Sequence, residues 1–136
     1  MMPIAPFVAG EVRKLKLRAA CGFLNCCNSG RGEVNERGTL NGLASAFMSV
    51  GVGAMVVCLW TVLDTTSGDI ADAFYDQLAK ATGTTTSRAL QAAILGSMRT
   101  GAAAREWSAF VLHGPSSEAK FLLSLEKNSI PSTAKL

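Results

Sequence analysis

Residues 23–34 read F-L-N-C-C-N-S-G-R-G-E-V, where a short apolar run passes into two adjacent cysteines and a polar, glycine-rich loop. The apolar run, residues 19–25, has the length of a buried β-strand. Cys27 therefore follows the carboxyl end of a predicted strand, the position at which open α/β sheets place their functional residues. A cysteine in such a loop, with Arg31 nearby, is expected to have a lowered thiol pKa.

The chain after this loop alternates between helical and strand patterns. The first helix is marked by one apolar stripe: Leu40, Leu43, Ala44 and Phe47. Gly51 ends this helix, a β-branched strand is predicted at 54–60, and two amphipathic helices follow between residues 65 and 101. A third strand is predicted at 107–112. This order predicts an α/β fold, with a mainly parallel sheet of about three strands and flanking helices.

Composition excludes several classes of function. Hydrophobic residues make up 49% and charged residues 17% of the chain, which is typical of a globular domain and not of a disordered one. The net charge of +3 is small, and the densest basic run, residues 12–18, alternates with leucines, so we expect no nucleic acid partner. His113 is the single histidine and the sequence has no CxxC pair, so we expect neither a metal nor a cofactor.

The cysteines and the apolar segments bear on location. Cys21, Cys26 and Cys58 lie in apolar runs and the N-terminus has no signal-peptide pattern, which favours reduced thiols in the cytoplasm. Residues 40–63 carry no charge and are long enough to span a bilayer. Gly51 divides them into a helical and a strand-like half, so a buried helix and strand is preferred to a membrane span.

Several ordered motifs resemble those of one known family. The cysteine stretch resembles the cysteine motif of the CHAT domain family, and four later segments resemble its following helices and strands: G-T-L-N-G-L-A-S-A-F-M-S-V-G, M-V-V-C-L-W-T-V-L-D, A-D-A-F-Y-D-Q-L and W-S-A-F-V-L-H-G. The resemblance covers about residues 11–114. The double cysteine followed by N-S-G-R-G-E is most similar to the CHAT domains that end animal tetratricopeptide-repeat proteins.

This resemblance implies a partial caspase-like fold of the clan CD cysteine peptidases, whose activity is thiol-dependent hydrolysis of peptide bonds. It places the nucleophile at Cys27, whose backbone N–H is also expected to donate to the oxyanion. Cys26 is the competing candidate. Asp64 lies where the family usually carries acidic residues, so it is either an acidic wall that selects a substrate side chain or a carboxylate at a helix N-terminus.

The histidine that serves as the base in this family precedes the cysteine, and none of the 26 residues before Cys27 is a histidine. The chain alone is therefore expected to be inactive on peptides. We expect an extended leading segment at 1–18, the C-terminal half of a CHAT domain at 19–115 and a partly disordered tail at 116–136. The chain is either a fragment of a longer product or a degenerate copy.

The expected partner is a peptide or protein, with an upstream half-domain or another chain covering an open sheet edge. A non-catalytic interaction or scaffold module is the main alternative to the peptidase-like function. A phosphate-binding loop at 30–38 and a membrane segment are further alternatives, each resting on a single weak pattern.

Overall fold

The structure is a computed structural model that describes residues 9–25, 33–34, 40–80 and 83–117. Three strands form the main sheet in the order β1-β4-β5: β1 (Ala19–Phe23), β4 (Val52–Cys58) and β5 (Phe110–His113). β1 pairs parallel with β4, and β5 pairs antiparallel with β4. Two short strands, β2 (Glu33–Val34) and β3 (Leu40–Asn41), form a separate antiparallel pair.

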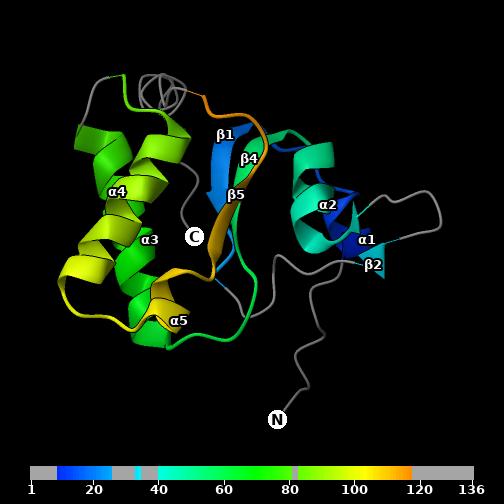
Figure 1. The fold of residues 1–136 in the computed structure, drawn as a ribbon. Helices are drawn as coiled ribbons and strands as arrows, with labels where there is room; N and C mark the ends of the chain where they lie inside the picture. Colours follow the sequence, from blue (N-terminus) through cyan, green and yellow to red (C-terminus); the bar gives the residue numbers. More distant parts are fainter. Residues whose placement is uncertain (1–8, 26–32, 35–39, 81–82, 118–136) are drawn as a thin grey trace, which may run out of the picture.

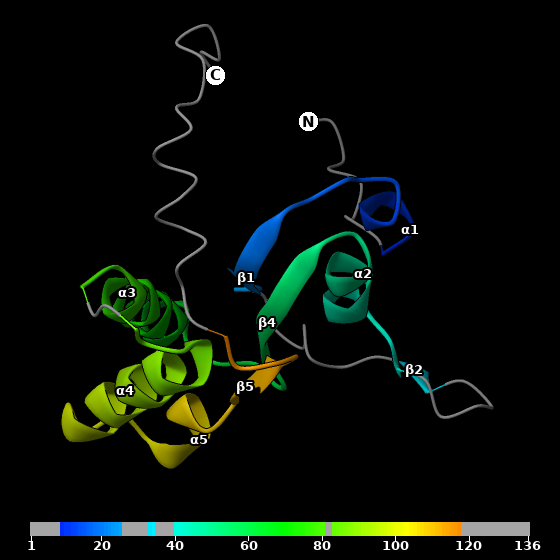
Figure 2. The same ribbon diagram turned by 90° about the horizontal axis from the view of Figure 1, so that it is seen from above.

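Helices cover both faces of the main sheet (Figures 1 and 2). One face carries α2 (Leu43–Ser49), against which α1 (Ala9–Val12) packs. The other face carries α3 (Asp64–Lys80), α4 (Thr86–Arg99) and α5 (Ala104–Trp107). The predicted α/β class with about three strands and flanking helices is confirmed.

Alternate residues of β4 build the two hydrophobic cores. Ala54, Val56 and Cys58 pack in the core that includes α3 and α4. Met55 and Val57 pack on the opposite side, in the core that includes α2. This alternation is the period of two that a strand covered on both faces requires. β4 is therefore the central element from which both layers are built.

The sheet is mixed because the connection from β4 to β5 contains two long helices, α3 and α4, followed by the short α5. α3 returns the chain from the carboxyl end of β4, and α4 then brings it back to that same end. A strand that starts there must run antiparallel to β4. β5 does so, with Phe110 opposite Cys58 and His113 opposite Met55.

Gly51 allows β4 to lie beside β1. Its backbone has φ +115°, a conformation that side-chain-bearing residues rarely adopt, and a Cβ atom there would overlap the carbonyl oxygen of Leu17. Around it, the N–H of Leu17 donates to the carbonyl of Val50 at 2.8 Å, and that of Ala19 donates to Gly51 at 3.2 Å. The glycine thus permits the close approach of the two chain segments.

Local differences from the sequence expectation have simple causes. The leading segment 1–18, expected to be extended, contains the helical turn α1, closed by a bond from the Arg13 N–H to the Ala9 carbonyl. Leu40 belongs to β3 and not to the predicted helix, because its backbone pairs with that of Val34 in β2. The charge-free residues 40–63 divide into β3, α2, β4 and a loop. No helix in the described part of the chain combines the length and apolarity needed to cross a bilayer.

Candidate functional site

The carboxyl ends of β1 and β4 lie at one edge of the sheet, as the parallel pairing requires. Phe23 is level with Val56, and the Leu24 N–H donates to the Val56 carbonyl at 2.9 Å. From this point the chain continues toward Cys27. Cys26, Cys27 and Arg31 lie outside the described residues, so the nucleophile position and its oxyanion donor stay predictions.

A side-chain hydrogen bond fixes the end of β1 to α3. The hydroxyl of Ser67 donates to Oδ1 of Asn25, two residues before Cys27. Ser67 is only 6% exposed, so its hydroxyl has few other partners. The sequence gave no signal that Asn25 would meet Ser67, because the two residues are 42 positions apart.

Two hydrogen bonds connect the loop between β4 and α3 to α5. The indole N–H of Trp60 donates to the Arg105 carbonyl at 2.7 Å, and the Leu63 N–H donates to the Glu106 carboxylate at 2.8 Å. In a capping box this acceptor would come from a Glu or Gln three residues into the helix. Thr66 occupies that position in α3, and the distant Glu106 supplies the carboxylate instead.

Asp64 is the first residue of α3 and its side chain is exposed. A carboxylate in a first helical turn is stabilised by the positive end of the helix dipole. Leu63, directly before it, is 62% exposed. Asp64 therefore lies at the carboxyl edge of the sheet as expected, while its contact with a substrate stays a prediction.

Comparison with known proteins agrees with this arrangement. The family model described as "CHAT domain" matches residues 5–115. The chain belongs to the CHAT domain family. The search of the curated proteins and the search of the solved structures gave no match to this chain. The family is caspase-like and peptidase-related, and the match covers the described α/β elements of this CHAT domain.

The single histidine of this CHAT domain lies away from the end of β1. His113 is in β5, and β4 separates β5 from β1. It is directly opposite Met55, so both side chains point to the same face of the sheet. Met55 packs toward α2, whereas Asn25 contacts α3. The described geometry therefore gives His113 no place beside the last residues of β1.

Two other cysteines of the CHAT domain are buried core residues, as their apolar surroundings predicted. Burial raises the pKa of the Cys21 thiol, which keeps it in the unreactive protonated form. The Cys58 thiol donates to the Trp60 carbonyl at 2.8 Å. Burial, and secondarily the nearby Cys21, raises the pKa of Tyr75. These groups have the properties of structural residues.

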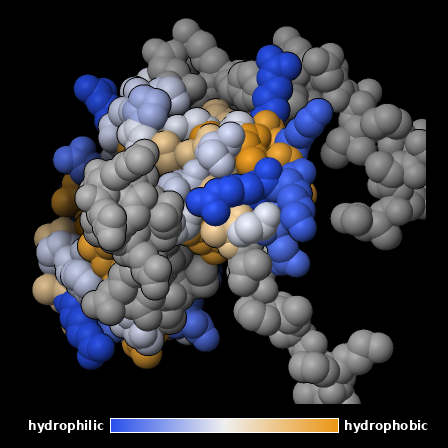
Figure 3. Space-filling model, turned by 90° about the vertical axis from the view of Figure 1, so that its right-hand side faces the viewer, coloured by the Kyte–Doolittle hydropathy of each residue, from blue (hydrophilic) through white to orange (hydrophobic). Residues whose placement is uncertain are grey.

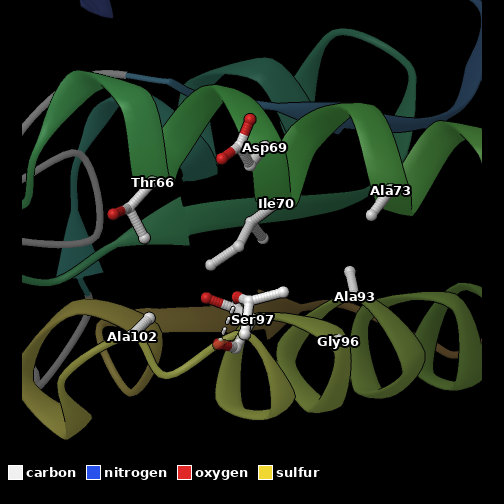
Figure 4. A pocket seen from close by; sticks show the side chains of 9 residues that line it. Thr66, Asp69, Ile70, Ala73, Ala93, Gly96, Ser97 and Ala102 are labelled. Carbon is white, nitrogen blue, oxygen red and sulfur yellow. Dashed lines mark hydrogen bonds between the residues drawn. The ribbon is translucent and has the colours of Figure 1, made fainter.

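A groove of about 350 Å³ lies between α3 and α4 (Figure 4). Its lining combines small or aliphatic residues with hydroxyl groups and one carboxylate: Ile70, Ala73, Ala93, Gly96, Ala102, Thr66, Asp69, Ser97 and Thr100. The Thr100 hydroxyl donates to the Ser97 carbonyl at 2.9 Å. The groove holds no thiol or imidazole. Among the described residues, no group of three or more His, Cys, Asp or Glu side chains is arranged to hold a metal ion.

Proposed function

We propose that this chain carries the cysteine-bearing part of a clan CD, caspase-like CHAT module, in which Cys27 is the nucleophile position for hydrolysis of peptide bonds. The observation that supports this most directly is the anchored end of β1. The Leu24 backbone and the Asn25 side chain tie the strand to β4 and α3, two residues ahead of Cys27. A nucleophile gains reactivity from a firmly held backbone of this kind.

We further propose that these 136 residues do not hydrolyse peptides on their own. A thiol nucleophile needs a base that removes its proton and later protonates the leaving amine. The sequence has one histidine, and β4 lies between its strand and β1. For hydrolysis to occur, the base would therefore have to come from a segment or chain that is not among these residues.

The cysteine loop supports a finer proposal about the parent protein. Its resemblance to the CHAT domains at the ends of animal tetratricopeptide-repeat proteins suggests such repeats upstream, with this chain as a fragment or a degenerate copy. The buried thiol of Cys21 agrees with a reducing, intracellular location. The substrate is a peptide or protein.

A non-catalytic interaction module is the second candidate function. It is favoured by β1, which pairs with β4 alone among the described strands and presents its other edge. An interaction module of this kind needs the strand edge but no reactive thiol.

The two functions differ in the chemistry of Cys27, and this difference can be measured. The 136-residue chain is treated with a limiting amount of a thiol-reactive peptide probe, and the labelled cysteine is identified by mass spectrometry. We expect Cys27 to react faster than Cys26, with labelling lost in Cys27→Ser and kept in Cys26→Ser. Equal reaction of the two thiols would overturn the nucleophile assignment and leave the interaction module.

Turnover is measured on the same protein with a mixed peptide library. We expect no cleavage products above those of Cys27→Ser. Cleavage that disappears in Cys27→Ser would contradict the proposed inactivity of the isolated chain.

A further inference from the structure

α3 and α4 lie side by side on one face of the sheet, and the groove of about 350 Å³ runs between them (Figures 1 and 2). The buried residues of both helices pack toward the sheet, so their opposite faces point outward. α4 also contacts β5, the strand farthest from β1 in the sheet. We call these two outward faces, with the groove between them, the α3–α4 surface. Its exposed residues include Asp69, Asp72, Asp76, Arg88, Leu95 and Arg99.

The outward face of α3 is acidic. Asp69, Asp72 and Asp76 are exposed and follow one another at intervals of three and four residues, so their carboxylates lie along one stripe of the helix. Asp76 pairs with Lys80 at 3.3 Å. In the part of the chain that the structure describes, Asp69 and Asp72 form no ion pair. Their charges are therefore available to a cation on another molecule.

The outward face of α4 is basic with an apolar centre. Arg88, Leu95 and Arg99 are exposed and recur at intervals of seven and four residues, which places them along one stripe of the helix. Leu95 is 40% exposed. Neither arginine forms an ion pair with another described residue. This stripe thus offers an apolar side chain between two unpaired cations.

The charges of the two helices match in level as well as in sign. Figure 4 shows Asp69 across the groove from Ser97, so the acidic stripe begins level with the last turns of α4. A two-fold axis parallel to the helices would bring each α3 over the α4 of a second copy at the same level. Asp69 and Asp72 of one copy would then face Arg99 of the other.

We propose that the α3–α4 surface binds the same surface of a second copy of this chain in a two-fold symmetric dimer. This inference goes beyond the proposed function and does not depend on the chemistry of Cys27. Each α3 lies over the α4 of the other copy, so every contact between an acid and an arginine is made twice. Leu95 of each copy lies over the groove of the other, where Gly96 has no atom within 4 Å of an added Cβ and leaves room for it.

A partner with charge of one sign fits this surface less well. An acidic helix would be attracted to α4 and repelled by α3, and a basic helix would meet the reverse. The side of the molecule over α1 and α2 gives a contrast, since strongly hydrophilic residues lie there beside hydrophobic ones (Figure 3). The charged residues of the segment after α1 are all positive, so that segment cannot pair with itself: Arg13, Lys14, Lys16 and Arg18.

Sedimentation equilibrium of the 136-residue chain, with a reducing agent and at low and moderate salt, measures the dimer dissociation constant. We expect a reversible equilibrium between monomer and dimer that weakens as salt is added. Arg88→Glu/Arg99→Glu makes both helices acidic and should raise the dissociation constant at least tenfold. Lys14→Glu/Lys16→Glu changes the net charge equally on exposed positions outside the surface and should leave it within twofold. Circular dichroism verifies that the variants are folded.

A mixture of two variants tests the pairing itself. Asp69→Arg/Asp72→Arg makes both helices basic, so this variant should also dimerise at least tenfold more weakly than the unaltered chain. Mixed with Arg88→Glu/Arg99→Glu, it should form a heterodimer, because each altered helix then meets the opposite charge. A chain that stays monomeric at the highest concentration, self-association that neither charge variant weakens, or a mixture without heterodimer would overturn the proposal.

Discussion

The carboxylate of Glu106 accepts a hydrogen bond of 2.8 Å from the backbone N–H of Leu63, 43 positions earlier in the chain. With the bond between Trp60 and Arg105, it makes the short helix α5 a brace for the loop that joins β4 to α3. That loop lies at the sheet edge where β1 ends. Four predictions follow from this and neighbouring contacts.

The hydrogen bond between Leu63 and Glu106 can be removed by one substitution. Glu106→Ala deletes the acceptor of the Leu63 N–H and should destabilise the protein by about 1 kcal/mol, the usual effect of losing a helix cap. Glu106→Gln keeps a carbonyl acceptor and should lose less than half as much. Urea unfolding of both variants measures this difference, and equal losses would show that the charge of Glu106, not the hydrogen bond, is what matters.

The bond between Asn25 and Ser67 should appear as coupling between the two positions. Asn25→Ala and Ser67→Ala should each cost about 1 kcal/mol, and the double variant should cost clearly less than the sum. The coupling arises because either single change already removes the whole interaction. The unfolding free energies of the four proteins provide the measurement. Strict additivity would mean that the two side chains do not interact in solution.

Two glycines should respond oppositely to the same substitution. Gly51→Ala should destabilise by more than about 2 kcal/mol, because φ is positive there and the new methyl group would overlap the Leu17 carbonyl. Gly96→Ala lies inside α4 with no atom within 4 Å of the added carbon, and should stabilise by about 0.5–1 kcal/mol. Thermal unfolding compares them, and a neutral Gly51→Ala would contradict the close approach of β1 and β4.

Stability should fall at alkaline pH through the buried thiol of Cys21 and the partly covered phenol of Tyr75, which is 42% exposed. Burial raises the pKa of the Cys21 thiol above its ordinary 9.0, and that of Tyr75 is likewise raised. The folded state therefore keeps protons that the unfolded state releases, so stability is complete below the unfolded pKa values and is lost as pH rises through the folded ones. Urea unfolding from pH 7 to 11 should show this loss. It should be smaller in Cys21→Ala and in Tyr75→Phe, and an unchanged slope in both would refute the assignment.

Patterns of local spacing were sufficient to predict most of the elements. Ile70, Phe74 and Leu78 form the buried stripe of α3 at the predicted spacing, and Leu90 and Ala93 that of α4. The ends of helices differ from the predicted ones where a specific hydrogen bond outweighs the apolar spacing. α4 begins at Thr86, because the side chain of Thr85 accepts the hydrogen bond from the Arg88 N–H and so caps the helix.

The relations between distant elements were harder to infer. The antiparallel direction of β5 depends on both helices α3 and α4 lying on one face, which no local spacing encodes. α5 was not predicted because its four residues include no buried position and thus no apolar stripe. The contact between Asn25 and Ser67 could not be inferred, because neither polar residue belongs to a recognisable local pattern. At the candidate site, Asp64 follows β4 as the first residue of α3 and its role stays a prediction, whereas Cys27 lies outside the described residues.

A brace without a buried residue has a thermodynamic consequence. α5 has no buried residue and contributes only the partly buried Trp107 to the core, so it should open more readily than the sheet and the long helices. Each opening would release Leu63 and Trp60 together and would loosen the start of α3, where Ser67 holds Asn25. Native-state hydrogen exchange of the Leu63 amide should then follow α5 rather than α3. The geometry around the end of β1 would thus depend on a short helix that opens easily, so a ligand or substitution at residues 104–107 would act on that geometry from a distance.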